Sequence, residues 1–224
     1  MRQDAMTQAT DLLARLARID CCALSDALDQ LKLTGVVSGL IQGSGGGRIA
    51  GRAITVRLVA GVKREGPPRH LCATAIELGG PGSIIVVEQR SGIEAGSWGG
   101  LLSMGAQTKG IEGVIAEGPV RDIDQAMEMG FPVFARSWTA RTARGRIVEQ
   151  STNEPVQIGD VTVHPGDYVL ADGSATIFVA EKHIEKVLAA AERIVAKEDL
   201  MAKEILAGTG IGTVMGANYE DMLK

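Results

Sequence analysis

The sequence predicts a mixed α/β sandwich, and two observations lead to that expectation. Short segments rich in Val and Ile, separated by Gly and Pro, are typical of strands: "SIIVVE", "EGVIAEG", "FPVFAR", "VTVHPGDYVLA" and "TIFVA". Helical patterns lie between only some of them, at about 70–79, 100–109 and 122–129. Because strands outnumber crossover helices, we expect a layered mixed sheet rather than a regular doubly wound one.

Helical segments are expected at both ends of a single domain that spans residues 1–224. Hydrophobic residues at helical spacing begin the chain (Leu12, Leu13, Leu16 and Ile19), and Ser25 is a plausible N-cap for "SDALDQL". We therefore expect an N-terminal helical segment over 1–40. A long helix from about Glu181 to Ala207, followed by a tail, is expected over 181–224.

Composition and charge exclude several classes of protein. The 224 residues are 45% hydrophobic and 22% charged, with a net charge of −4, so a nucleic-acid ligand is not expected. The apolar runs are too short to span a bilayer, and no membrane partner is expected. The amino terminus has no signal-peptide pattern, and three cysteines form no disulfide framework. We expect a reduced, cytoplasmic protein.

The glycine-rich segment "QGSGGGRIAG" is interpreted as a turn that leads into a strand. It has no Gly-Lys-Ser/Thr sequence, and its glycines precede the strand "AITVRLV" instead of following one. A dinucleotide fingerprint has the opposite order, with a strand first and a helix after the glycines.

Residues 96–122 carry the pattern that most resembles a ligand site. The turn "GSWGG" leads into a helix that should start near Leu101, and Gly110 should end that helix as a left-handed C-cap. The first N–H groups of a helix lack internal partners and favour an anion, which Gly99 and Gly100 would leave accessible. The strand "EGVIAEG" then ends in "PVRD", at the edge of the sheet where ligands usually bind.

Arg121 and Asp122 of "PVRD" each have two interpretations. Arg121 can bind a carboxylate or polarise a carbonyl group, or it can form an ordinary surface ion pair. Asp122 can hold a divalent metal, or it can form a capping box with Gln125 for the helix "IDQAMEM". The residues alone therefore indicate an anion site beside a candidate metal ligand.

The stretch "WGGLLSMGAQTKGIEGVIAEGPVRD" resembles the RraA-like family. That family includes the 4-hydroxy-4-methyl-2-oxoglutarate and 4-carboxy-4-hydroxy-2-oxoadipate aldolases and the regulator of ribonuclease E activity. Further matching segments occur in the same order along the chain: "SDALD", "IAGRAITVR", "GGPGSIIVVE", "PVFAR" and "VTVHPGDYVLAD". The resemblance implies an α/β/β/α sandwich similar to the swivelling phosphohistidine domain. It also implies homotrimers or homohexamers with the active site at a subunit interface.

The resemblance further implies a class II pyruvate aldolase that uses Mg²⁺ or Mn²⁺. The backbone N–H groups of Leu101 and Leu102, beside Gly99 and Gly100, would bind the carboxylate of a 2-oxo acid. Arg121 would contact the 2-oxo group, and Asp122 would hold the metal, partly through waters. Cleavage would leave a stabilised pyruvate enolate, and oxaloacetate decarboxylation passes through the same enolate.

Two positions depart from the family pattern. The family's aldolases carry Asp or Glu directly before the Leu-Leu pair, where this chain has Gly100. That carboxylate is associated with ordering metal-bound water or handling protons. The family's later acidic run is reduced here to "ADGSATIFVA", which keeps only Asp172 and Gly173.

Glu198 is the acid most able to substitute for the missing one. It falls on the apolar stripe of the last helix, and the resemblance implies that this helix brings an acid into a neighbouring subunit's site. Alternatively, the helix has left the core by residue 198. Glu94 and Glu117 near the site are interpreted as ordinary surface carboxylates, and His70 as a structural or solvent-facing histidine rather than a general base.

The sequence leaves three functions open. The first is a metal-dependent lyase for 2-oxo acids. The second is a regulator that binds ribonuclease E or another protein, although such regulators tend to lack the helical segments expected here at both ends. The third is a binder of an unassigned 2-oxo or sugar acid.

Overall fold

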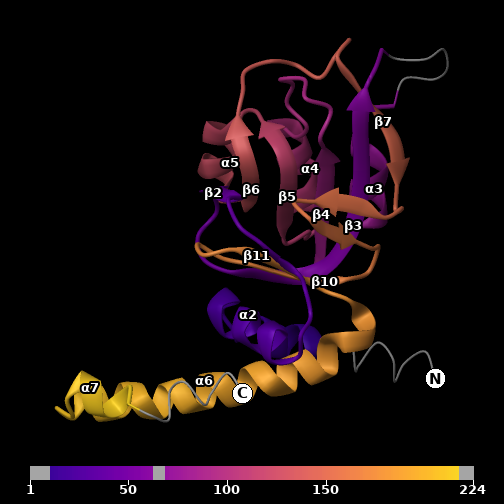
Figure 1. Ribbon diagram of the computed structural model, residues 1–224. Helices are drawn as coiled ribbons and strands as arrows, with labels where there is room; N and C mark the ends of the chain where they lie inside the picture. Colours follow the sequence, from indigo (N-terminus) through magenta and orange to yellow (C-terminus); the bar gives the residue numbers. More distant parts are fainter. Residues whose placement is uncertain (1–10, 63–68, 217–224) are drawn as a thin grey trace.

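The computed structural model describes residues 11–62 and 69–216 (Figure 1). Within these residues the main sheet has nine strands, eight of them in the order β1-β11-β10-β3-β4-β5-β6-β2, while β7 pairs with β3. The strands are β1 (Val36–Val37), β2 (Ile41–Ser44), β3 (Ile49–Ala60), β4 (Ser83–Gln89), β5 (Gly113–Val120), β6 (Val133–Trp138), β7 (Ile147–Thr152), β10 (Tyr168–Ala171) and β11 (Thr176–Val179). A separate hairpin joins β8 (Val156–Ile158) to β9 (Val161–Val163).

Four parallel strands, β3 to β6, form the centre of the sheet. One face packs against the helices α3 (Ala73–Leu78), α4 (Gly100–Thr108) and α5 (Ile123–Met129). These strands are rich in Val and Ile because both faces of the sheet are buried in this region. Their parallel direction brings the carboxyl ends of β4 and β5 to the same edge of the sheet.

Strands β10 and β11 separate two hydrophobic clusters. Val169 and Phe178 pack with the hairpin β8–β9 against the second face of the parallel strands. Leu170 and Ile177 point the other way and pack against α2 (Cys21–Gln30) and α6 (Ile184–Leu206). Because side chains alternate along a strand, two short strands can supply both clusters. The sheet therefore curls, with α3, α4 and α5 on one side and α2 and α6 on the other (Figure 1).

The predicted α/β class is confirmed, and the chain carries the expected helices near both ends. The finer likeness to the swivelling phosphohistidine domain and the single-domain organisation stay predictions. In the N-terminal segment expected over 1–40, residues 11–16 and α2 are helical, and residues 1–10 lie outside the described residues. Strands β1 and β2 follow α2, so the prediction that the chain is helical up to residue 40 is wrong.

The start of α2 also differs from the prediction. Asp20 is its N-cap, and the Asp20 side chain accepts a hydrogen bond from Ala23 N. Ser25 lies inside the helix because Asp20 already satisfies a free N–H group of the first turn.

The C-terminal helix extends beyond the core. A short 3₁₀ helix, η1 (Glu181–His183), precedes α6, and α7 (Ile211–Val214) follows it. Ile194 is the last buried residue of α6, and the rest of the helix projects from the body (Figure 1). The tail expected after about Ala207 includes α7, and its residues 217–224 lie outside the described residues. In the part of the chain that is described, no helix has the length and apolar character needed to cross a membrane.

Candidate active site

The glycine-rich turn before α4 is attached to the end of β5 by hydrogen bonds. Ser97 donates from its backbone N and from its Oγ to Pro119 O, at 2.8 and 2.9 Å. Arg121 N donates back to Trp98 O at 3.0 Å. These bonds hold the amino end of α4 beside Arg121 and Asp122, as the sequence predicts for the two halves of the site.

Glycines in this turn make room for Arg121 and Asp122. A Cβ atom on Gly96 would lie 2.9 Å from Arg121 Cγ. A Cβ atom on Gly99 would lie 2.9 Å from Asp122 Oδ2 and 3.2 Å from Arg121 Cγ. Gly99 has an extended backbone that any residue can adopt, with φ −161°. Close approach of the two side chains is therefore what requires glycine here.

Asp122 presents its carboxylate to the amino end of α4. Its Oδ2 accepts a hydrogen bond from Gly100 N at 3.1 Å, and its Oδ1 lies 3.2 Å from Arg121 Nε. The residue has a left-handed backbone, with φ 58° and ψ 37°. That conformation is uncommon for a residue other than glycine and is found often at functional sites.

The predicted capping box of Asp122 and Gln125 is wrong. Asp122 occupies the N-cap position of α5, but its side chain makes no capping hydrogen bond. The left-handed backbone turns the carboxylate away from α5 and toward α4. Asp122 therefore does not cap α5, and its carboxylate accepts a hydrogen bond from the first residue of α4 instead. The surface ion pair expected for Arg121 is present with Asp122 itself.

The helix α4 has the ends that the sequence predicts. It begins at Gly100, one residue before the expected start, and Gly110 follows its C-cap with φ 72°. Leu101 and Leu102 lie in the first turn, whose N–H groups have no acceptor within the helix. The side chain of Leu101 is 80% exposed, so the surface beside these N–H groups is apolar and open.

Glu198 is not brought to Arg121 and Asp122 within one chain. It lies on α6, which packs with α2 and β10–β11, whereas α4 and α5 pack on the far face of the parallel strands. The pKa of Glu198 is raised by burial and by the negative charges of Asp20, Asp26 and Asp199. A role for Glu198 in a neighbouring subunit's site stays a prediction.

Glu117 is not the ordinary surface carboxylate that was expected. Its side chain is 11% exposed and pairs with Arg136 at 2.9 Å, and it accepts a hydrogen bond from Gly159 N at 3.0 Å. On the neighbouring strand, Glu88 pairs with Arg57 and accepts from Gln157 N. These two carboxylates fix the β8–β9 hairpin to the sheet, which is a structural role.

Glu94 and His70 are exposed, as the sequence suggests, and Asp172 accepts two hydrogen bonds from backbone N–H groups. Glu94 is exposed and pairs with Arg141 at 3.1 Å. His70 is also exposed, and its Nδ1 lies 2.9 Å from Leu71 O. Asp172 accepts hydrogen bonds from Cys21 N and Ser174 N. Burial opposes ionisation of Asp172, but these bonds outweigh it and lower its pKa.

Asp122 is the candidate oxygen ligand for a divalent metal at this site, which stays a prediction. Among the described residues, no group of three or more His, Cys, Asp or Glu side chains could hold a metal ion. Mg²⁺ nevertheless fits a single carboxylate, because it keeps several waters and takes further oxygens from its substrate. The half-exposed carboxylate of Asp122 leaves room for such waters.

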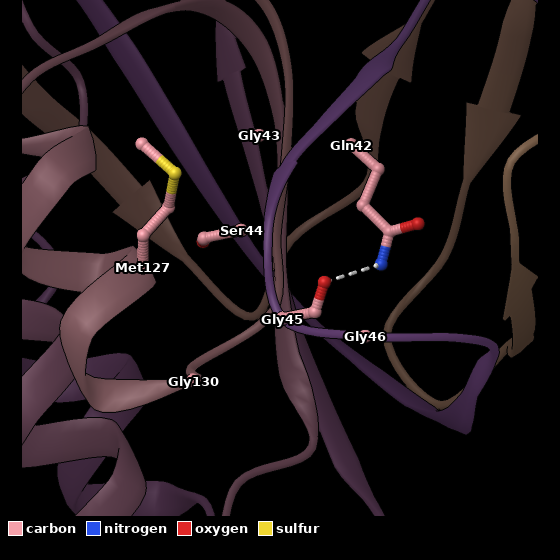
Figure 2. A pocket seen from close by; sticks show the side chains of 7 residues that line it. All are labelled: Gln42, Gly43, Ser44, Gly45, Gly46, Met127 and Gly130. Carbon is pink, nitrogen blue, oxygen red and sulfur yellow. Dashed lines mark hydrogen bonds between the residues drawn. The ribbon is translucent and has the colours of Figure 1, made fainter.

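A cavity of about 410 Å³ lies at the other end of α5, between that helix and β2 (Figure 2). Its lining residues are Gln42, Gly43, Ser44, Gly45, Gly46, Met127 and Gly130. Gln42 Nε2 donates to Gly45 O at 3.2 Å and to Gly47 O at 3.0 Å. A side chain of the protein thus closes this glycine turn, which agrees with its interpretation as a turn into β3.

Gln125 lies beside the start of α4, a position that the sequence interpretation did not predict. Its Oε1 lies where a side chain on Gly100 would be, 1.6 Å from the position of a Cβ atom. The sequence does show a glycine at the first position of α4, where the helical backbone itself does not require glycine. It does not reveal which side chain fills the space.

Comparisons with known proteins identify the family of the chain. The RraA-like family model, described as Aldolase/RraA, matches residues 21–177. The chain is 27% identical over 199 residues to "Protein DlpA" of Legionella pneumophila, a match that covers 89% of this chain and 32% of that protein. The chain thus spans about a third of that relative's length.

Two further similarities cover nearly the whole chain. It is 26% identical over 202 residues to "Putative 4-hydroxy-4-methyl-2-oxoglutarate aldolase" of Halalkalibacterium halodurans, covering 89% of this chain and 91% of that protein. The crystal structure of an uncharacterized protein from Pseudomonas syringae has a TM-score of 0.83 at 26% identity, and the match covers 93% and 98% of the two chains. The chain belongs to the RraA-like family.

Proposed function

We propose that the protein is a divalent-metal-dependent lyase for 2-oxo acids. It would act as a class II pyruvate aldolase of the 4-hydroxy-4-methyl-2-oxoglutarate type and would also decarboxylate oxaloacetate. The observation that carries the proposal is the left-handed Asp122, whose carboxylate faces the amino end of α4 rather than capping its own helix. The printed name of the Halalkalibacterium relative supports the same activity.

The chain's own residues would orient the substrate. The N–H groups of Leu101 and Leu102 at the helix terminus favour the carboxylate of the 2-oxo acid. Within the described residues, Arg121 uses only its Nε in a side-chain hydrogen bond. Its terminal NH₂ groups are thus available to the 2-oxo oxygen, where a preorganised cation stabilises developing enolate charge.

Asp122 would hold Mg²⁺ or Mn²⁺ with the help of water and substrate oxygens. When bound, the ion supplies Lewis acidity at the 2-oxo acid. Asp122 and Arg121 are adjacent, so the carboxylate also keeps the guanidinium directed at the site. In a homotrimer or homohexamer, Glu198 of a second subunit would bring its carboxylate into this site and replace the acid that is missing at position 100.

A regulatory role is the second candidate, because the family description names RraA beside aldolase. Such a protein would bind ribonuclease E or another protein, and its 2-oxo acid site would catalyse no reaction. A binder of an unassigned 2-oxo or sugar acid would use the helix terminus and Arg121 without catalysis.

Release of pyruvate separates these possibilities. Purified protein with Mg²⁺ or Mn²⁺ is incubated with 4-hydroxy-4-methyl-2-oxoglutarate and, separately, with oxaloacetate, and pyruvate is measured by NADH oxidation with lactate dehydrogenase. The lyase proposal expects protein-dependent pyruvate from oxaloacetate at least. Absence of pyruvate from both substrates with either metal would favour a regulator or a binder.

A further inference from the structure

The side chain of Gln125 occupies the space that a side chain on Gly100 would need. A Cβ atom on Gly100 would lie 1.6 Å from Gln125 Oε1, 2.6 Å from Cδ and 3.3 Å from Cγ. Gly100 is the first residue of α4 and is not among the glycines with positive φ. A positive φ is therefore not the reason for glycine at this position, and the end of the exposed Gln125 side chain lies where a Cβ atom would be.

Gln125 reaches α4 from the first turn of α5, together with Asp122. Asp122 Oδ2 accepts from Gly100 N at 3.1 Å, and the Gln125 carboxamide lies over the same residue. The side chain of Gln125 is exposed, and no hydrogen bond to it is found among the described residues. A carboxamide has two N–H donors and one oxygen acceptor, so this group can bind a ligand at the start of α4.

We propose that Gln125 is a substrate-binding residue, and that residue 100 is glycine in order to admit its carboxamide. The inference rests on the proposed function and specifies it further. The Gln125 amide would donate a hydrogen bond to the carboxylate that the N–H groups of Leu101 and Leu102 bind. Since the amide carries no charge, it adds a contact to the anion without competing with Asp122 for a cation.

Binding of oxalate tests the contact. Oxalate is a planar dicarboxylate that resembles the enolate of pyruvate, and its Kd is measured by isothermal titration calorimetry with Mg²⁺ present. Gln125→Ala should raise the Kd about tenfold, because a hydrogen bond to a charged group is lost. Gln125→Glu should raise it further, because it places a negative charge beside the anion.

A double-mutant cycle tests why residue 100 is glycine. Gly100→Ala should displace the carboxamide and raise the Kd about as much as Gln125→Ala does. The double variant, Gly100→Ala with Gln125→Ala, should bind oxalate no more weakly than Gln125→Ala alone. Strong non-additivity of this kind is expected for residues in direct contact.

Gln107→Ala is the matched control. Gln107 is an exposed glutamine that joins the same two helices at their other ends, where its Nε2 donates to Met129 O at 2.9 Å. Its loss should leave the Kd for oxalate unchanged, even where the melting temperature falls. Melting temperatures of all variants establish that each protein is folded.

The outcomes distinguish this proposal from the proposed function. If the wild type binds oxalate but both Gln125 variants bind it equally well, the substrate contact is overturned and the proposed function stands. If the effects of Gly100→Ala and Gln125→Ala on the free energy of oxalate binding simply add, the explanation for glycine at position 100 is overturned. A wild type that binds no oxalate, with or without Mg²⁺, overturns the proposed function and the contact together.

Discussion

At the scale of single residues, the site depends on which side chains fill the space beside three glycines. Gly96 and Gly99 lie against Arg121 and Asp122, and Gly100 lies against Gln125. The sequence shows the glycines and predicts a close approach, and it identifies Arg121 and Asp122 from their place after a strand. It cannot show that Asp122 turns away from its own helix, because that depends on a contact with a residue 22 positions away.

The glycine at position 100 leads to a prediction about activity. An acid at this position is expected to favour carbon–carbon cleavage, but its Cβ would collide with Gln125. Gly100→Asp should therefore raise the ratio of 4-hydroxy-4-methyl-2-oxoglutarate cleavage to oxaloacetate decarboxylation mainly when combined with Gln125→Ala. A general acid or base typically contributes about 10²–10⁴-fold in rate, so the ratio should rise by roughly 10²-fold.

The double variant is compared with Gln125→Ala alone, so that both proteins share any loss of substrate binding that Gln125→Ala causes. Paired initial rates on the two substrates give the ratio for each variant. An unchanged ratio in the double variant would show that a carboxylate at position 100 does not limit cleavage.

At the scale of helices and strands, the sequence predicts the elements better than their ends. The apolar stripe of α6 correctly predicts a long helix, yet burial ends at Ile194 and leaves Glu198 half-buried near α2. Periodicity gives the face of a helix but not the residue at which the helix leaves the core. The prediction of the N-cap of α2 is wrong for a similar reason, since both Asp20 and Ser25 are suitable capping residues.

Glu198 should make stability depend on pH. Burial and the negative charges of Asp20, Asp26 and Asp199 raise its pKa, so the folded protein disfavours the charged carboxylate. The stability that this protonated group contributes is present below the unfolded pKa of about 4.3. It is lost as pH rises through the folded pKa. Glu198→Gln should therefore raise the melting temperature at pH 7 by about 1–2 °C, as expected for roughly 0.5 kcal/mol in a chain of this length.

The same substitution should have no effect near pH 4, where Glu198 is largely protonated. Glu204→Gln, an exposed position on the same helix, is the control and should change neither melting temperature. A lower melting temperature for Glu198→Gln at pH 7 would instead mean that the charged carboxylate has a favourable partner.

At the scale of the whole molecule, the order of strands is the least predictable feature. β10 lies between β3 and β11, and β2 pairs with β6 at the far edge. These pairings join segments far apart in sequence, and local patterns do not specify them. The expected layers came from the resemblance to the RraA-like family, whose motifs identify long-range contacts that periodicity cannot.

The projecting end of α6 supports the prediction that the protein assembles. Leu200 and Leu206 are exposed there, and Leu101 is exposed beside the site. Light scattering should give three or six times the mass of one chain, because association would bury these apolar side chains. Glu substitutions at Leu200 and Leu206 should lower that mass and the activity together. A monomer with full activity would contradict the role proposed for Glu198 of a second subunit.

The central claim, that Asp122 makes this a metal-dependent lyase, is tested most directly by oxaloacetate decarboxylation after chelation. Pyruvate formation is measured as Mg²⁺ is added back to the wild type and to Asp122→Asn, with the protein-free rate subtracted. Asn tolerates the left-handed backbone, so the variant should stay folded. We expect a saturating rise for the wild type and a rate at least about a hundredfold lower for Asp122→Asn. A chelated wild type that is fully active, or an Asp122→Asn variant that Mg²⁺ restores, would contradict the claim.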